Sequence, residues 1–446
     1  MGDAVADALG DMLFGASVDI SYGPEGTPPP PVEERRGSAA ATGPGPSGWR
    51  ATIVLRLGER VARLIGDGTP SSLGELLGVL PGAGLRAAEQ LRPACTEGPK
   101  APPALRRAVR DTVAAEVLAT YVTTRLGAPA SRRLMAETLE YLIVLSGSRV
   151  EAHDLTHGVV IADVLPGTPR IELRYPDDLR GVKRAPLLFD GRRSVLVVDR
   201  DGRARTELQR HRLARLGGRA APSASGEAWP DSGSLVAEVT SILGGVGFYV
   251  RADRSIWTFV DGQPLLVRRR EHWTAFPLEL AASISNMIGG GRAAALVARA
   301  AFMISAQPYG AILAIVDGAD AVENLVSVKD RYDLRDRIDR AALRPETRLH
   351  HLIDAEDLDE YILARLATLD GATILDRAGR LLAYGAIVAT SDSEHEGART
   401  AAARTLSEKA IVVLKVSVDG DITIFQSGSV VTTLLGRPPH VREGGP

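Results

Sequence analysis

The chain has 446 residues, with 53 basic and 55 acidic side chains and a formal net charge of −2. This balance argues against a protein that coats nucleic acid or lies along a membrane surface. Hydrophobic residues make up 45% of the chain, and at roughly 100–200 residues per domain the length suits two or three packed domains. The single cysteine, Cys95, rules out an internal disulfide and a thiolate-rich metal site within one chain, and it is typical of a reducing compartment.

The N-terminus shows neither the basic start nor the apolar run of a secretory signal. The most apolar later stretch, residues 293–304, is interrupted by Arg299 and is much shorter than the roughly 20 residues of a membrane-spanning helix. We therefore expect a cytoplasmic protein with no membrane partner.

Residues 1–49 have the composition of a disordered arm or linker. Glycine and proline supply roughly half of residues 22–48, and such a segment cannot bury enough apolar surface to offset the entropy lost on ordering. After it, residues 104–126 and 131–145 place apolar side chains at three- and four-residue spacing. This spacing predicts a helical subdomain over residues 50–150.

Residues 151–275 are predicted to form a strand-rich α+β unit. Turn residues separate short apolar runs, a pattern typical of β-hairpins, at residues 159–164, 171–175, 186–189 and 194–198. A second small antiparallel sheet is predicted over residues 247–267. Between the two, residues 217–233 have the composition of a linker. The arginine-rich stretch before this linker lacks the interleaved aromatic residues of a nucleic-acid-binding surface, so we interpret it as a solvated helix.

The pattern changes over residues 276–437. Helical segments alternate with strand-like runs that are nearly apolar throughout, such as residues 311–316, 372–375 and 410–416. Fully apolar strands are typical of a sheet that helices cover on both faces. We expect an α/β fold in which a C-terminal mixed-sheet domain is preceded by the helical and α+β regions.

Several patterns that carry chemistry in other proteins are weak here. Three glycines at residues 289–291 precede a predicted helix, but no Lys-Ser or Lys-Thr follows, which favours a turn over a phosphate loop. The sequence has no Gly-x-Ser-x-Gly and no identifiable base for Cys95, so nucleophilic hydrolysis has no support. Two histidine pairs are metal candidates, although a helix-end or loop interpretation is favoured for both: His153 and His157 near Asp154 and Asp163, and His350 and His351 beside Asp354.

One part of the last domain suggests a ligand site. Leu369-Asp370-Gly371-Ala372 joins a predicted helix to a strand, which leaves the Asp370 carboxylate at a turn and allows a ligand to approach the backbone at Gly371. About 25 residues later, Gly397-Ala398-Arg399-Thr400 opens a helix, whose unpaired amides attract anions. A carboxylate for a metal and a cationic helix start together favour a nucleoside triphosphate site.

These segments resemble the diadenylate cyclase domain, best known from the DNA-integrity scanning protein and from membrane-anchored cyclases. The resemblance covers about residues 281–428 and depends on the order of its markers: residues 309–316, Asp370-Gly371-Ala372, Gly397-Ala398-Arg399, Ala402, Ala403 and residues 406–408. In that family two domains face each other and each binds ATP. The Asp of the Asp-Gly-Ala motif helps to hold the metal, and an Arg-His-Arg motif engages phosphates.

The resemblance implies that Asp370 and Arg399 are catalytic residues, with Asp370 holding Mg²⁺ or Mn²⁺ and Arg399 as the first arginine of the phosphate motif. It also implies nucleotide contacts at Gly371, Ala372, Gly397, Arg399, Thr400 and Arg404. The chain departs from the family where Arg399-Thr400-Ala401 stands in place of Arg-His-Arg. At about 1.5–3 kcal/mol for each lost charge-assisted bond, the two losses amount to roughly 3–6 kcal/mol, or on the order of 10²–10⁴ in binding or rate. Arg404 from the next helical turn and the Thr400 hydroxyl are the candidates for partial compensation.

We therefore expect a nucleotide sensor with a degenerate diadenylate-cyclase-like domain, which binds ATP, a related nucleotide or a nucleotide-derived signal without efficient catalysis. The alternative is an active, metal-dependent diadenylate cyclase that makes cyclic di-AMP from ATP, and its chemistry would require a homodimer. A third interpretation is an interaction protein whose nucleotide site is vestigial. The sequence shows no effector domain, so a sensor would act through an effector protein encoded nearby.

Overall fold

The computed structural model describes residues 1–24, 37–45, 49–64, 72–94, 101–126, 132–150, 153–162, 173–182, 185–216, 234–335, 352–353, 355, 358–388 and 397–436. The chain divides into two compact units, one of Met1–Arg63 with Gly68–Pro277 and one of Leu278–Pro446 with the short segment Leu64–Asp67. No helix among the described residues combines the length and the apolar character needed to span a membrane.

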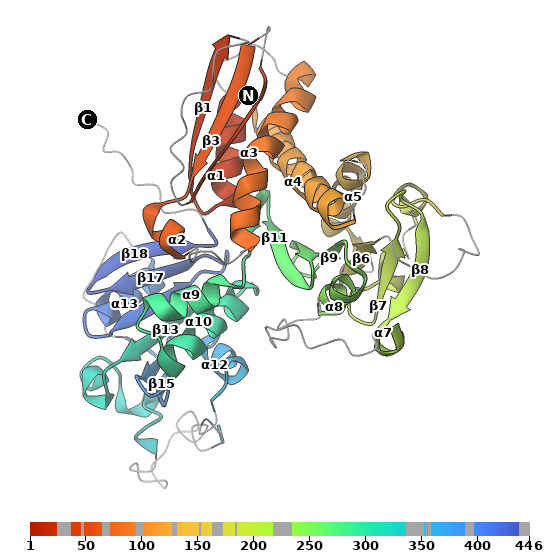
Figure 1. Cartoon of the computed structure of the whole chain (residues 1–446). Coiled ribbons are helices and arrows are strands. Elements are labelled where there is room, and N and C mark those ends of the chain that lie inside the picture. Colours follow the sequence, from red (N-terminus) through yellow and green to blue (C-terminus); the bar gives the residue numbers. More distant parts are fainter. Residues whose placement is uncertain are drawn as a thin grey trace. The chain divides into compact units, whose positions relative to one another are not determined.

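A three-stranded antiparallel sheet begins the first unit. Its central strand β3 (Trp49–Arg56) pairs with β1 (Ser17–Pro24) on one side and β2 (Ser38–Pro44) on the other. Helices α1 (Gly2–Met12) and α3 (Ser72–Leu91) pack against each other and against this sheet (Figure 1).

The prediction of a disordered arm over residues 1–49 is therefore wrong for its described part. Pairing with β3 satisfies the backbone of the Gly- and Pro-containing strands, and α1 supplies the apolar surface that they lack by burying Leu9 and Met12 completely. The composition rule fails because a neighbouring strand and helix provide the burial. Residues 25–36 and 46–48 lie outside the described residues.

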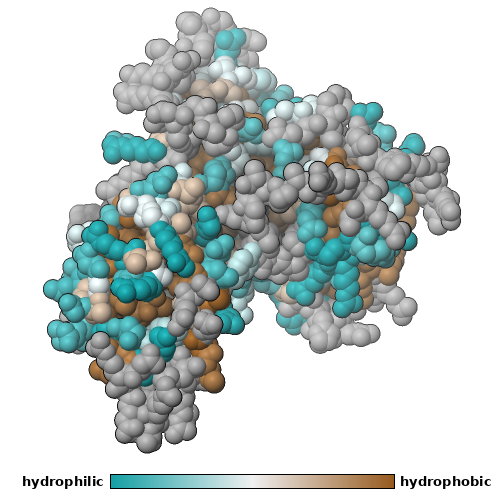
Figure 2. Space-filling view, turned by 60° about the horizontal axis from the view of Figure 1, so that its bottom comes forward, coloured by the Kyte–Doolittle hydropathy of each residue, from teal (hydrophilic) through white to brown (hydrophobic). Residues whose placement is uncertain are grey.

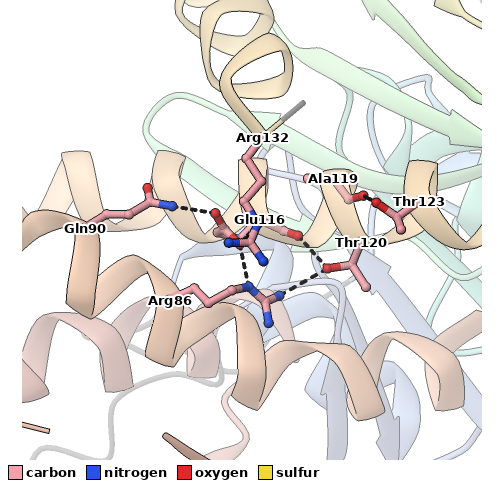
Figure 3. A network of polar contacts seen from close by, with 7 residues as sticks. All are labelled: Arg86, Gln90, Glu116, Ala119, Thr120, Thr123 and Arg132. Atoms are coloured by element: carbon pink, nitrogen blue, oxygen red, sulfur yellow. Dashed lines mark hydrogen bonds and ion pairs between the residues drawn. The ribbon is translucent and has the colours of Figure 1, made fainter. Parts of the chain in front are cut away.

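The two predicted helices of the next region are confirmed as α4 (Pro103–Leu126) and α5 (Arg132–Ser146). Between α3 and α4 the Glu116 carboxylate, 3% exposed, accepts hydrogen bonds from Arg86 Nε and Gln90 Nε2, both at 2.5 Å (Figure 3). Arg132 Nε lies 3.5 Å from the same carboxylate. Glu116 thus links three helices through one buried charge.

A seven-stranded sheet with the order β12-β11-β10-β9-β6-β7-β8 forms the rest of the first unit. Its strands are β6 (His157–Ile161), β7 (Ser194–Val198), β8 (Ala204–Gln209), β9 (Val246–Val250), β10 (Ile256–Val260), β11 (Gln263–Arg269) and β12 (His272–Ala275). Strand β6 pairs in parallel with β7 and antiparallel with β9. The two predicted sheets are therefore one sheet, since β6 is buried throughout and is paired along both edges.

Further short elements complete this unit: α2 (Glu59–Leu64), η2 (Arg92–Ala94), β4 (Arg149–Val150), β5 (His153–Asp154), η3 (Asp177–Leu179), α6 (Ala185–Leu188), α7 (Arg210–Leu216) and α8 (Ser234–Leu243). The strand predicted over residues 186–189 is instead helix α6, because a short apolar run does not distinguish a strand from a buried helical turn. The predicted linker 217–233 lies outside the described residues. The regions 50–150 and 151–275, predicted as separate, share one compact unit in which α5 contacts β9 and β10.

The second unit is built on a six-stranded mixed sheet with the order β15-β14-β13-β16-β17-β18. Its strands are β13 (Ala311–Val316), β14 (Ala372–Asp376), β15 (Leu381–Ala386), β16 (Val412–Val416), β17 (Ile422–Gln426) and β18 (Ser429–Leu434), and its helices are α9 (Leu280–Met287), α10 (Gly291–Ser305), η4 (Ala319–Val322), η5 (Val328–Asp330), α12 (Glu360–Ala367) and α13 (Ala398–Ser407). Only β13 and β14 pair in parallel among these described strands.

Helices cover this sheet on both faces, as the apolar strands predicted. Ala403 and Leu406 of α13 pack with Ile312 and Ala314 of β13 on one face. Side chains alternate along a strand, and α10 and α12, which contact each other and β13, lie on the other face. The mixed α/β fold predicted for this part of the chain is confirmed.

Large hydrophobic side chains at the described surface are scattered over different elements. Val144 on α5 is 63% exposed, and Leu188 on α6 is 65% exposed. The visible face in the space-filling view intersperses hydrophilic and hydrophobic residues (Figure 2). Single exposed hydrophobic residues such as Val144 are normal on protein surfaces. Leu188 has an exposed neighbour on α6, Leu187 at 52%.

Candidate nucleotide site

The predicted site residues meet at one end of the C-terminal sheet. The parallel register pairs Ile312 with Ala372, so the amino ends of β13 and β14 lie side by side. Strand β16 runs antiparallel to β13 and pairs Lys415 with Ile312, which brings its carboxyl end to the same place. The start of α13 reaches this edge as well, because the Arg399 guanidinium lies against Gly310, the residue before β13.

Gly371 fixes the turn that presents Asp370. Its φ of +104° is strained for residues with a side chain. A Cβ at this position would also lie 2.5 Å from the carbonyl carbon of Gly385 and 2.7 Å from the backbone nitrogen of Ala386 on β15. The close approach predicted for a ligand at Gly371 is therefore made by the neighbouring strand, and the glycine acts by setting the direction of the Asp370 side chain.

Asp370 and Arg399 form an ion pair across this end of the sheet. Oδ1 of Asp370 lies 3.7 Å from a terminal guanidinium nitrogen of Arg399, and the two side chains are 88% and 47% exposed. An exposed pair of this length contributes no more than about 1 kcal/mol. A charged ligand can therefore separate the two groups at little cost.

Gly310 determines how Arg399 lies. A Cβ on Gly310 would be 2.8 Å from the guanidinium, so this position leaves the space that the arginine fills. Gly310 is part of the marker segment 309–316 but is not among the predicted site residues. Its signal was the Tyr309-Gly310 step before an all-apolar strand.

A second cation stands beside the helix start. Nζ of Lys415 donates a hydrogen bond to Oγ1 of Thr400 at 3.2 Å. Lys415 is the only charged residue in β16, whose other positions are all buried. Lys415 is not among the predicted site residues, and a single lysine in an apolar strand gives no specific sequence signal for a ligand site. The Thr400 hydroxyl predicted to contact phosphate is thus already a partner of an ammonium group.

Residues 298–430 match the family model of the nucleotide-binding domain of the DisA bacterial checkpoint controller, abbreviated DAC. The second unit contains a DAC domain. The chain matches none of the curated proteins and none of the solved structures. The matched residues run from α10 to β18 and include Asp370, Arg399 and Lys415.

Two predicted contact residues of the DAC domain, Arg404 and Ala372, lie differently from expectation. Arg404 donates a hydrogen bond to the Gly428 carbonyl at 3.0 Å from the last turn of α13, so it secures the β17–β18 turn and does not compensate at the helix start. Ala372 is fully buried in the core beneath α13. Gly397 is the N-cap residue of α13, at the helix start that the sequence predicts. Ala401, which stands where the family has its second arginine, is only 8% exposed.

The described residues contain no group of three or more His, Cys, Asp or Glu side chains that could hold a metal ion. Asp370 is therefore a single carboxylate ligand candidate. Mg²⁺ is commonly held by one or two carboxylates together with substrate phosphates and water, so a lone exposed Asp370 fits a metal that arrives with a polyphosphate and does not fit a site formed by protein ligands alone.

The histidine metal candidates are not supported in the described part of the chain. His157 lies in β6 with an exposed fraction of 0% and contacts the rings of Tyr141 and Phe189. Burial lowers the pKa of His157 to about 4, although the carbonyls of Pro186 and Phe189 oppose this in part. His153 is in the separate β4–β5 ribbon. Cys95, His350, His351 and Asp354 lie outside the described residues.

Proposed function

We propose that the DAC domain binds a nucleoside triphosphate or a nucleotide-derived signal at the Asp370–Arg399 end of its sheet and does not cyclise it efficiently. One observation carries this proposal: Asp370 and Arg399, about 30 residues apart in sequence, approach to 3.7 Å within a domain of a nucleotide-binding family. On this proposal the protein is a cytoplasmic sensor, since its ligand is found in the cytoplasm.

Each group at this end has a distinct task. The Asp370 carboxylate would be a ligand of Mg²⁺ or Mn²⁺, and the bound ion would neutralise phosphate charge. The Arg399 guanidinium and the Lys415 ammonium would pair with phosphate oxygens. The first turn of α13 adds the positive end of a ten-residue helix. Because the Asp370–Arg399 pair is weak and exposed, it is readily exchanged for these contacts.

The proposed loss of catalysis follows from Thr400 and Ala401. Relative to the Arg-His-Arg of the family, the domain lacks two charge-assisted contacts, worth roughly 3–6 kcal/mol or on the order of 10²–10⁴ in rate. Ala401 is buried, and Arg404 is bonded to Gly428, so neither supplies a substitute. Such a domain would report on its ligand through an effector protein encoded nearby.

An active diadenylate cyclase is the second candidate, and Lys415 is the observation that favours it. Its ammonium group is bonded to Thr400 and could replace one of the two missing contacts. This function requires a homodimer, since each half of the reaction uses one of two facing domains.

Incubation of the full-length protein with ATP and Mg²⁺ or Mn²⁺ separates these functions. The sensor proposal expects saturable binding by calorimetry, weaker binding in Asp370→Ala, and no cyclic di-AMP above background by chromatography. Asp317→Ala is the matched control, because Asp317 is a similarly exposed carboxylate paired with Arg377 and follows β13 at its other end. Abundant product that disappears in Asp370→Ala would establish the cyclase instead. Absence of binding to ATP and to cyclic dinucleotides would contradict both and leave an interaction protein.

A further inference from the structure

A cavity of about 460 Å³ lies at the opposite end of the same sheet. Its lining includes Ala319, which follows β13, and Ala378, Gly379 and Arg380, which join β14 to β15. The five paired positions from Ile312–Ala372 to Val316–Asp376 separate it from the Asp370 end, a length of about 16 Å. The volume is within the range of pockets that hold small molecules.

One wall of this cavity combines apolar and aromatic groups. Leu381 is 4% exposed, whereas its neighbour Leu382 points to the other face of β15 and packs in the core beneath α13. The guanidinium of Arg335 lies over the ring of Tyr332 at 4.0 Å, and the Tyr332 hydroxyl is fixed by a hydrogen bond to the Ile353 carbonyl at 3.0 Å. The wall therefore presents a flat, positively charged surface beside Leu381.

The charged side chains of the lining are three arginines, Arg292, Arg335 and Arg380, and one carboxylate, Asp333. The Asp333 carboxylate is already matched, since its two oxygens accept hydrogen bonds from Arg331 at 2.6 and 2.7 Å. Arg380 is similarly matched by the buried Asp376, with 2.6 Å between Nε and Oδ2. Asp333 and Asp376 are thus paired with Arg331 and Arg380, and neither forms an ion pair with Arg292.

Two further acidic residues, Glu323 and Asp320, act electrostatically on Arg331. The hydrogen bond from Arg331 to Asp333 raises the pKa of the guanidinium above its ordinary value, and Glu323 and Asp320 add to this effect. In contrast, the side chain of Arg292 makes no ion pair or hydrogen bond with the part of the chain that the structure describes. Arg292 is thus a cation at the rim of the cavity, and none of the described residues forms an ion pair or a hydrogen bond with its side chain.

We propose that this cavity is a second ligand site of the DAC domain, for a small planar organic anion. Its carboxylate or phosphate group pairs with Arg292, and its flat body packs between Leu381 and the Arg335–Tyr332 stack. This site is independent of the nucleotide site, because no lining residue of the cavity is among the residues of the Asp370 end.

Calorimetric titration of the full-length protein with phenyl phosphate and with benzoate tests the proposal. At least one anion is expected to bind saturably, and the tighter one identifies the acidic group. Benzyl alcohol has the ring without the charge and is expected to bind the wild-type protein at least about tenfold more weakly than the tighter anion. The tighter anion is expected to bind Arg292→Ala at least about tenfold more weakly than it binds the wild type. In both cases a charge-assisted bond is lost. The controls Arg299→Ala, on the same helix, and Arg399→Ala, at the other end of the sheet, should leave the affinity unchanged.

Three results would overturn the proposal: no saturable binding of either anion, equal binding of the alcohol, or unchanged affinity in Arg292→Ala. A loss of anion binding in Arg399→Ala with retention in Arg292→Ala would show that the probe occupies the nucleotide site. That result would leave the proposed nucleotide function standing, so the two proposals fail separately. Arg292 is exposed, and its substitution is not expected to disturb folding.

Discussion

Asp370 and Arg399 lie largely in solvent, and this decides what the pair contributes. A buried pair of this kind would be a structural element, whereas an exposed pair at 3.7 Å stabilises the fold very little. Selection for stability alone gives no reason to place an arginine against Gly310. The geometry is better explained by a ligand that uses both charges.

Replacement of Arg399 by alanine should therefore weaken nucleotide binding without unfolding the domain. One charge-assisted contact is lost, so the dissociation constant for ATP with Mg²⁺ should rise about 10- to 100-fold in calorimetry. Arg377→Ala is the matched control, since Arg377 also pairs with an exposed aspartate, and its affinity should equal that of the wild type. An unchanged constant in Arg399→Ala would remove this arginine from the site.

Gly371 should be the least replaceable residue of the Asp-Gly-Ala turn. Alanine there adopts a φ of +104° and brings its Cβ within 2.5 Å of the β15 backbone, so we expect a loss of at least about 1–3 kcal/mol in the free energy of unfolding. Urea denaturation of Gly371→Ala and of the wild type measures this loss in the free energy of unfolding. Gly318→Ala is the control, because Gly318 has an extended backbone and open space around it; equal stability of the two variants would contradict the structural role assigned to Gly371.

At the scale of elements, α3 and α4 depend on one buried carboxylate. Glu116 is 3% exposed, and Arg86, which bonds it, is 29% exposed. Glu116→Ala leaves Arg86 and Gln90 without their acceptor, and we expect a loss of about 3 kcal/mol, the lower end for a broken buried pair, because Arg86 reaches solvent. Thermal unfolding followed by circular dichroism tests this. Glu59→Ala removes an exposed pair with Arg63 and should change stability by no more than about 0.5 kcal/mol.

The elements of the C-terminal domain were more predictable from sequence than those of the first unit. Most of its strands are largely apolar, so the sequence pattern located β13 to β17. Strand β18, which carries Ser and Thr, was not predicted. The first unit instead depends on pairing between distant segments. Strands β1 and β2 are stable only against β3, and β6 joins two groups of strands that are far apart in sequence. Local composition predicts neither the pairing with β3 nor the position of β6.

In the candidate site too, features that depend on local sequence were predicted and features that depend on long-range contacts were not. The approach of Asp370 to Arg399 was expected from the Asp-Gly turn and the helix start. The positions of Gly310, Lys415 and Arg404 were not, because each depends on which strand lies beside β13 and on which way α13 points. Such contacts follow from strand order, which a single sequence does not specify.

At the scale of the whole molecule, the two compact units should respond differently to acid. His157, in the first unit, has a pKa of about 4 in the folded state, against about 6.5 when unfolded. Between these values the unfolded chain binds more protons, so the first unit loses stability as the pH falls from about 6.5 to about 4, by roughly 3 kcal/mol in total. Above pH 6.5 this contribution is fully present and constant.

Calorimetric unfolding across this pH range provides the measurement. The transition of the first unit should move to lower temperature in acid, and His157→Asn, which does not titrate, should reduce that movement even if it lowers the starting stability. His211→Gln is the control, since His211 is exposed, and it should keep the full acid response. An acid response of the same size in His157→Asn would assign the effect to other groups.

The β13–β14 pair is buried at every position, and packed interiors of this kind resist deformation. The strand pair is therefore expected to move as one rigid element, with the Asp370–Arg399 ion pair at one end and the cavity at the other. If neither the nucleotide nor the organic anion displaces this strand pair, their free energies of binding add. If one does, the departure from additivity is the same whichever ligand is added first. A double titration would thus reveal whether the domain relays information along its length or holds two molecules without any communication between them.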